Sequence, residues 1–292
     1  MNVSNVWSIW LKPSDAVECE LDGLAEYADC DGAVDILKEL LLGKTLVAEV
    51  LQRENPVSVI LFDTWGPGEI NLNHAVFLSL MTPRLPERGC IGRCYMCHVT
   101  PTGTVWLQIM GPGLDTLGNI MCAFEEFCKG ADSMTEDPVT GRIYGCQSRS
   151  DSKFYRAVLV SPEPLPSGEF KVRLVDHGFE QRAYIAELRD VDSLGEFVSP
   201  LTISGMFVHA VSCQMRGLRK EDGFYWSADV AAQVSSLSGG PHVELLCRVT
   251  KPGTNEEETV VELFRRNEEG QLRSINNDVI ETMKQTRCPG LH

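Results

Sequence analysis

The sequence lacks the features that would place it quickly in several large classes of protein. No segment of its 292 residues reaches the roughly 18 to 20 uncharged apolar residues that a membrane span requires. The stretch MNVSNVWSIWLKPSD has neither a basic start nor a long apolar run, so we expect no signal peptide. Phosphate-binding loops, G-x-S-x-G turns and Ser/His/Asp arrangements are also missing. We therefore expect neither a membrane protein nor one of the common enzymes.

Basic residues are scarce. The chain has 26 Lys and Arg against 41 Asp and Glu, which gives a formal net charge of -15. This balance argues against a general nucleic-acid clamp and suits a basic partner such as an Arg-rich peptide, although solubility alone explains it equally well. The 11 cysteines, an odd number without a secretory signal, predict reduced and mostly buried thiols.

The segment CYMCH (94–98) matches a haem-attachment pattern and, with Cys90, resembles a zinc knuckle. Its surroundings instead predict a strand. On a strand, successive side chains point to opposite faces, so one face would carry Cys94, Met96 and His98 and the other Tyr95, Cys97 and Val99. The two sulfurs could not then share a metal, and no second ligand pair stands at zinc spacing. We expect no metal, no haem and no other cofactor.

Several segments have clear secondary-structure signals. Residues 94–110 predict a hairpin around Pro101–Gly103, and residues 114–131 have apolar side chains at helical spacing. A second hairpin is predicted in KFYRAVLVSPEPLPSGEFKVRLVDHGFEQ (153–181), where two alternating strands flank a Pro- and Gly-containing turn. The Pro-rich segment 81–89 predicts a joint between domains.

The chain also contains an internal repeat. AVECELDGL (16–24) is similar to AVSCQMRGL (210–218), and each is followed by a helical run and two strands. Both copies then reach an Ile-Asn pair, which we aligned as Ile70–Asn71 with Ile275–Asn276. The repeat predicts a tandem module whose first copy is incomplete at its amino end.

The strands KFYRAVLV (153–160) and KVRLVDHGFEQ (171–181), followed by AYIAELRDV (183–191) as an exit strand, resemble the extended Tudor domain family. The resemblance implies a mostly β fold with helices. A Tudor (SH3-like) barrel is inserted into a staphylococcal-nuclease-like (SN-like) barrel of OB type, preceded by a partial copy of the SN-like part. The implied domains are a partial SN-like segment and an extended Tudor domain, with ranges 1–85 and 86–292. Within the second, the SN-like first part with its linker helix covers 86–131, the Tudor barrel covers 140–192, and the SN-like second part covers 193–292.

In this family, four aromatic rings and one asparagine recognise symmetrically dimethylated arginine, and the rings attract the cation. Carried over residue by residue, the four ring positions fall on Arg149, Tyr155, Leu174 and His177 and the asparagine position on Phe179. Only one ring is intact, Arg149 places a like charge at the site, and Phe179 cannot accept a hydrogen bond. Candidate supporting residues are Tyr144 and Phe154 as walls and Asp176, which we expect to bind loop amides. The resemblance therefore implies a degenerate cage with weak or absent dimethylarginine binding.

The resemblance also implies a non-catalytic adaptor in small-RNA (piRNA) silencing, located in the cytoplasm in perinuclear germ granules (nuage). Its expected partner is the N-terminal Arg-rich tail of a Piwi-class Argonaute protein, or another pathway protein, held in a cleft between the two barrels. One alternative is a protein–protein or dimerisation scaffold that binds no tail. Another is an OB-fold nucleic-acid-binding module, for which RGLRK (216–220) and ELFRR (262–266) are small basic spots.

Overall fold

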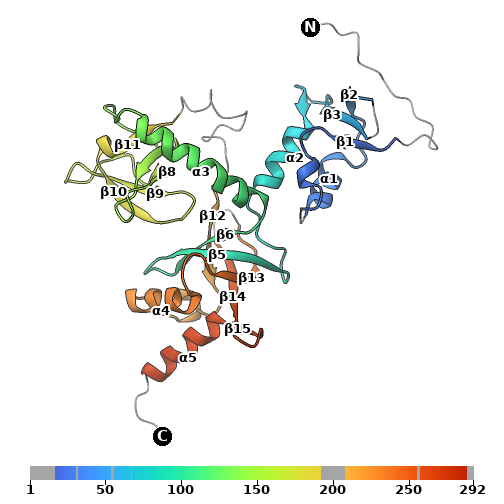
Figure 1. The fold of residues 1–292 in the computed structure, drawn as a ribbon. Helices are drawn as coiled ribbons and strands as arrows, with labels where there is room; N and C mark the ends of the chain where they lie inside the picture. The colour runs from blue at the N-terminus through green and yellow to red at the C-terminus, as the bar shows by residue number, and fades with distance from the viewer. Residues whose placement is uncertain are drawn as a thin grey trace. The chain divides into compact units, whose positions relative to one another are not determined.

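The computed structural model describes residues 17–30, 32–53, 56–66, 68–191, 208–254 and 257–287. The chain divides into two compact units, residues 1–82 and residues 83–292. Both units are built mainly from strands with helices packed on them (Figure 1). The expected start of the second SN-like part at residue 193 lies outside the described residues. No helix among the described residues is long and apolar enough to cross a membrane.

The first unit is a small sheet with two helices. Its elements are β1 (Cys19–Leu21), η1 (Ala25–Tyr27), α1 (Ala33–Leu41), β2 (Val47–Gln52), β3 (Val57–Asp63), β4 (Ile70–Asn71) and α2 (Leu72–Met81). The strand order is β1-β3-β2, and β4 also pairs with β3. The apolar faces of α1 and α2 meet in a core that contains Ile36, Val76 and Met81. These elements form the partial SN-like copy.

The second unit contains a six-stranded sheet, and five of its strands close into a barrel, the SN-like barrel. The strands of the sheet are β5 (Ile91–Val99), β6 (Thr104–Ile109), β12 (Ala210–Met215), β13 (Glu244–Lys251), β14 (Thr259–Arg266) and β15 (Leu272–Ser274). The order is β12-β6-β5-β13-β14-β15, and a further pairing between β12 and β14 closes the barrel. Its helices are η4 (Lys220–Asp222), α4 (Ala228–Ser238) and α5 (Ile275–Arg287).

A five-stranded sheet, the Tudor sheet, is inserted between β6 and β12. Its elements are β7 (Tyr144–Gln147), β8 (Phe154–Leu159), β9 (Phe170–Leu174), β10 (Glu180–Ala183), η2 (Ile185–Glu187) and β11 (Leu188–Asp190). Because β6 and β12 pair directly, with Gln108 opposite Ala210, the Tudor sheet is an insert in the SN-like barrel. The linker helix α3 (Pro112–Gly130) precedes it, and Phe124 and Cys128 of this helix pack against Phe154.

The exit strand expected over residues 183–191 is interrupted. Ala183 ends β10, the helical turn η2 follows, and β11 begins only at Leu188. The reason is the strand order β10-β9-β8-β7-β11, in which β10 and β11 lie at opposite ends of the sheet. A continuous strand could not pair with both β9 and β7, so the chain turns between them.

The internal repeat is visible in the topology of the two units. β1 pairs with β3 in parallel, and β12 pairs with β14 in parallel in the same way. In each copy, the second residue of the last helix (α2 or α5) is a buried asparagine, and its side chain binds the backbone of this parallel pair of strands. The Asn73 Nδ2 donates to Val59 O (2.9 Å), and the Asn276 Nδ2 donates to Val261 O (3.2 Å).

The equivalence assigned from the sequence was therefore displaced by two residues. Asn73, rather than Asn71, corresponds to Asn276, because only Asn73 reaches the backbone of the parallel strands. Asn71 instead caps α2, where its side chain accepts a hydrogen bond from His74 N (3.0 Å).

The cysteines are less uniformly buried than expected. Five of the ten that the structure describes are buried, namely Cys94, Cys128, Cys146, Cys213 and Cys247, and all ten are free thiols. Three others are exposed, namely Cys19, Cys90 and Cys122. The buried ones act as small core residues between strands and helices, which is where this residue type packs well.

Candidate peptide-binding site

The candidate site lies at one end of the β8–β9 hairpin. Tyr155 of β8 faces His177 in the turn after β9, and their rings meet edge to face with centroids 5.0 Å apart. The turn is tight because the amides of His177 and Gly178 both donate to Leu174 O, at 3.1 and 2.8 Å. Gly178 has a φ of +71°, a conformation that residues with a Cβ adopt at a cost. The structure thus brings together two of the predicted site residues, Tyr155 and His177.

A carboxylate that the sequence analysis missed stands beside this ring pair. The Tyr155 hydroxyl donates to Asp151 Oδ2 (2.7 Å), and the Lys153 amide donates to Asp151 Oδ1 (3.2 Å). Partial burial acts to raise the pKa of Asp151, but these hydrogen bonds outweigh it and hold the pKa below its ordinary value. The site therefore carries an ionised, exposed carboxylate. The sequence signal that could have pointed to Asp151 is the Asp-Ser pair before the strand, because Asp favours turns. The structure has a turn there, in which Ser152 has a φ of +62°.

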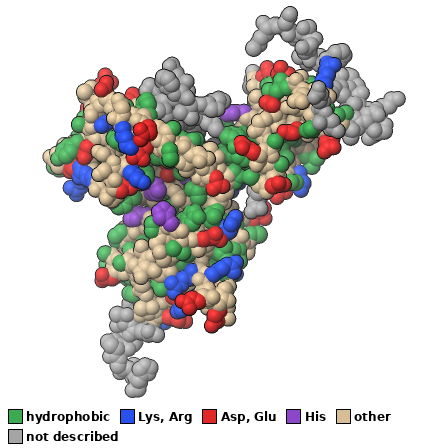
Figure 2. All heavy atoms as spheres, in the orientation of Figure 1, with side chains coloured by type: hydrophobic (Ala, Val, Ile, Leu, Met, Phe, Trp, Pro, Cys, Tyr) green, Lys and Arg blue, Asp and Glu red, His purple; other side chains and the backbone are tan. Residues whose placement is uncertain are grey.

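The ring of His177 is neutral at physiological pH. Its burial lowers the pKa below the ordinary value, and the nearby His242 lowers it further, against the opposing effect of Asp176 and Asp151. A neutral imidazole presents a ring to a ligand, whereas an imidazolium would repel a cation. Histidine side chains gather where the Tudor sheet meets the SN-like barrel (Figure 2).

Phe179 lies on the other side of the turn, 40% exposed, and its ring meets His98 edge to face at 5.4 Å. The alternation expected for residues 94–99 was wrong after Met96. A bulge between Met96 and His98 shifts the register, so that Val99 is buried in the barrel core with Cys94 and Met96. The extra residue turns His98 away from that core, which frees its ring to contact Phe179.

Asp176 joins the two barrels rather than stabilising its own turn. Its carboxylate accepts a hydrogen bond from Nε of Arg156 (2.8 Å). Both residues are buried, Asp176 at 2% exposure and Arg156 at 0%. The Oδ1 of Asp176 also accepts from the amide of His209 (3.2 Å), just before β12, and its carbonyl accepts from Gln108 Nε2 (2.6 Å). The expected loop-amide role is corrected: within the described part of the chain, the carboxylate binds the amide of His209, just before β12, and the buried guanidinium of Arg156.

Trp106 of β6 completes this junction. Its ring packs directly on Gly178, where any Cβ would collide with it. The guanidinium of Arg173 lies over the same ring, 5.1 Å from its centroid. These contacts explain why the turn that carries His177 and Phe179 has a fixed position relative to the SN-like barrel.

Arg149 and Leu174 do not form walls of the site. The Nη2 of Arg149 is bound by Glu169 Oε1 (2.9 Å) and Glu187 Oε2 (3.1 Å), so the expected repulsion by a free like charge is offset by two carboxylates. Leu174 is 4% exposed and belongs to the core of the Tudor sheet. Neither side chain presents a π face to a ligand.

The two candidate supporting walls are structural. Tyr144 is 1% exposed, and its hydroxyl accepts from the Val139 amide (2.7 Å). Phe154 is 5% exposed, packs on α3 and has Arg189 over its ring. Their burial corrects the expectation that either could border the cage, because a wall must be reachable from solvent. The aromatic rings left accessible at this end of the hairpin are therefore Tyr155 and His177, which meet, and Phe179 on the other side of the turn.

Among the described residues, no group of three or more His, Cys, Asp or Glu side chains is placed to hold a metal ion. Cys94 is fully buried in the barrel core, and Cys97, the bulged residue between Met96 and His98, is not part of that core. Burial raises the pKa of Cys97 to about 12, so this thiol is protonated at neutral pH.

A family model for the Tudor domain matches residues 92–206. The matched range runs from β5 through β11, so this part of the chain is similar to a Tudor domain. Among curated proteins, Tudor domain-containing protein 7B of Danio rerio is 25% identical over 241 residues, which cover 77% of this chain and 21% of the relative. Tudor domain-containing protein 7 of Mus musculus is 24% identical over 275 residues, which cover 90% of this chain and 24% of the relative. The chain spans about one fifth of the length of the curated relatives it matches.

Solved structures show that about two thirds of the chain has the fold of an extended Tudor domain. The extended Tudor domain TD3 of mouse TDRD1, in complex with a MILI peptide containing dimethylarginine, superposes with a TM-score of 0.54 and 17% identity. The match covers 69% of this chain and 95% of that one. A variant of the extended Tudor domain of Drosophila melanogaster Papi, with alanine in place of one aspartate and in complex with an unmethylated Piwi N-terminal peptide, gives a TM-score of 0.55 and 19% identity. That match covers 66% of this chain and 97% of the other.

Proposed function

We propose that the extended Tudor domain of this chain binds an arginine-bearing peptide at the surface formed by Tyr155, His177 and Phe179, and that dimethylation of the arginine is not required. The observation that carries the proposal is the Asp151 carboxylate beside the Tyr155 ring. A ring and a carboxylate together suit a guanidinium that keeps all its N–H donors. Each methyl group removes a donor, and only two or three rings are present to compensate.

The relatives support the class of ligand. A variant of the similar extended Tudor domain of Papi, with alanine in place of one aspartate, is known with a Piwi N-terminal peptide in both an arginine-dimethylated and an unmethylated form. The net charge of -15 favours a cationic segment over an acidic one. A small cavity of about 190 Å³ next to the His98 ring, bordered also by Met96, Ser235 and Pro241, offers space for a neighbouring peptide side chain.

The broader role that we propose is a binding module without catalysis, an adaptor in small-RNA silencing that acts in cytoplasmic germ granules. The partner would be the Arg-rich N-terminal tail of a Piwi-class Argonaute protein. A pull-down from germ-cell extract, with and without arginine methyltransferase inhibition, tests both parts of this role. Recovery of such a protein in both conditions is expected, and recovery only without the inhibitor would contradict the proposal.

Calorimetry with matched peptides tests the binding site itself. Arg-Gly-Arg-Ala peptides in unmethylated and symmetrically dimethylated form should bind with similar affinity, and a peptide with citrulline in place of arginine should not. Tyr155→Ala should weaken binding by roughly tenfold, which corresponds to the upper range of a cation–π contact, while Tyr155→Phe should lose less. Tyr225→Ala is the matched control, because Tyr225 is 73% exposed on the SN-like barrel outside the site.

Two results would contradict the proposal. A strong preference for the dimethylated peptide would mean that more rings converge on the ligand than Tyr155, His177 and Phe179. Unchanged affinity in Tyr155→Ala would place the ligand elsewhere and favour the alternative scaffold that binds no tail here.

A further inference from the structure

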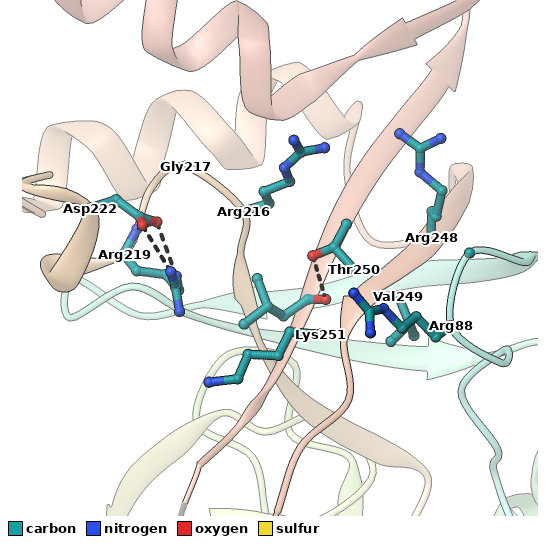
Figure 3. Close-up of a pocket in the computed structure, with 11 residues that line it drawn as sticks. Arg88, Arg216, Gly217, Arg219, Asp222, Arg248, Val249, Thr250 and Lys251 are labelled. Atoms are coloured by element: carbon teal, nitrogen blue, oxygen red, sulfur yellow. Dashed lines mark hydrogen bonds and ion pairs between the residues drawn. The ribbon is translucent and has the colours of Figure 1, made fainter.

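A second site lies on the SN-like barrel, where basic side chains line a pocket of about 690 Å³ (Figure 3). Three separate segments supply five cations, namely Arg88 from the loop before β5, Arg216 and Arg219 from the loop after β12, and Arg248 and Lys251 from β13. Two of them belong to the RGLRK segment. The arginines of ELFRR are not part of the pocket, since Arg265 donates to Leu237 O and Arg266 to Gly270 O.

The backbone fixes the three segments against one another. The Gly89 amide donates to Val249 O (3.0 Å), which ties the loop of Arg88 to β13. The Arg216 amide donates to Val261 O (2.8 Å), which ties the loop after β12 to β14. A bulge in the β13–β14 pairing lies between Val249 and Lys251. Five cations that line one pocket on a framework fixed in this way indicate a built site rather than scattered surface charge.

The charge of the pocket is opposite to that of the chain. The five cations pair with three carboxylates, those of Asp222, Glu257 and Glu262. The whole sequence, in contrast, has a net charge of -15. Glu262, 7% exposed, binds Arg248 Nη2 (2.6 Å) and lies 3.5 Å from Arg216 Nη1. One carboxylate shared by two guanidiniums leaves most of their N–H groups available. Arg88 has no ion pair with any residue that the structure describes.

The cations can be reached by a ligand. The side chains of Arg216, Lys251 and Arg248 are 62%, 49% and 38% exposed. Arg219 is held in place by Asp222, whose Oδ1 it binds at 2.8 Å. Guanidiniums converging from different segments are the arrangement by which proteins bind phosphoryl groups, because each offers a planar pair of donors.

We propose that this pocket binds a phosphorylated serine or threonine side chain of a peptide segment. None of its eleven lining residues is aromatic, so it offers no surface on which a nucleotide base could stack. An extended polynucleotide would also meet the negative charge of the remaining surface, whereas a single phosphoryl group meets only the pocket. A phosphopeptide therefore fits these observations better than an RNA does. The site is independent of the proposed arginine-binding surface on the Tudor sheet.

Fluorescence anisotropy with the full 292-residue chain tests the proposal. The probe is a labelled Gly-Ala-Ser-Ala-Gly peptide with phosphoserine at its centre, compared with the same peptide bearing serine, and with a labelled oligouridylate RNA. Only the phosphopeptide should bind, and inorganic phosphate should compete with it. The double variant Arg88→Ala/Lys251→Ala should weaken binding by roughly tenfold or more. It leaves the buried Glu262 with both of its arginines, so the fold should be retained, as a thermal melt would verify.

Arg266→Ala/Lys284→Ala removes the same number of charges from the SN-like part outside the pocket and should bind within about twofold of the unaltered chain. Tyr155→Ala should likewise leave phosphopeptide binding unchanged, which separates this site from the proposed arginine site. Equal binding of the serine and phosphoserine peptides, or an unaffected pocket variant, would overturn the proposal. Binding of the RNA but not the phosphopeptide, or of no probe up to millimolar concentration, would overturn it as well.

Discussion

His209 tests how strongly burial at the barrel junction controls stability. Its side chain is 1% exposed, and its Nε2 has no hydrogen-bond partner among the described residues. Burial lowers the pKa of this histidine from the ordinary 6.5 to about 4, an effect that Asp176 opposes and Arg156 reinforces. The imidazole is therefore neutral in the folded protein at any pH well above 4.

The sign of the effect follows from the two pKa values. Between about pH 6.5 and pH 4, the unfolded chain binds a proton at His209 that the folded chain does not bind. The stabilisation is thus complete above pH 6.5 and is lost as the pH falls through the folded-state pKa. At 1.36 kcal/mol per pKa unit, lowering the pH from about 7.5 to about 4.5 should cost about 2.5 kcal/mol of unfolding free energy through this group alone.

Hydrogen exchange measured by mass spectrometry on the full chain isolates this contribution, because it reports the amides of β12 separately from the first unit. Protection of residues 210–215, corrected for the intrinsic exchange rate, should fall on acidification more in the unaltered chain than in His209→Gln. His74→Gln is the control, since His74 is exposed in the first unit. If the unaltered chain and His209→Gln lost protection equally, the argument that the His209 imidazole is buried in its neutral form at the barrel junction would be refuted.

Two further variants test the same junction. Gly178→Ala should lower the melting temperature of the second unit strongly, because a Cβ would collide with Trp106 at a backbone φ of +71°. Gly168→Ala, at a φ of +77° but with nothing near the added Cβ, should cost less, and equal losses would contradict the role of the collision. Asp176→Asn should destabilise the domain by about 3 to 5 kcal/mol in denaturant titrations, since it removes the negative charge that the buried Arg156 guanidinium binds. A loss below about 1 kcal/mol would show that the pair is not desolvated.

The fold could be predicted because its pattern is carried by many residues at once. The alternation in residues 153–174 specifies β8 and β9, and two copies of one segment order specify two sheets with the same parallel pair. The position of the buried asparagine could not be assigned in the same way. Asn71 and Asn73 stand two residues apart, and only the start of α2 decides which side chain faces the strands.

The binding surface was less predictable because it depends on which side of each strand end faces solvent. Tyr144 and Phe154 are aromatic, as cage walls must be, yet both are buried. Helix α3 packs on Phe154, and the 139–144 turn binds the hydroxyl of Tyr144. His98 was assigned to the wrong face because one extra residue in a bulge reverses the alternation, and no residue type in CYMCH announces that bulge.

Two aspartates differ in whether their carboxylates are open to a ligand, which explains why the surface should accept an arginine although it lacks most of the rings of the family cage. Asp176 is the carboxylate that the family pattern brings to notice, but Arg156 and the His209 amide already occupy its oxygens inside the protein. It cannot also neutralise a ligand. Asp151 stands outside, exposed, ionised and bound to the one ring that remains in its expected place. In the proposed binding mode, the charge for ligand recognition would therefore come from the loop before β8, and the preference between methylated and unmethylated arginine should depend on Asp151 more than on any residue of the Val-Asp-His-Gly turn.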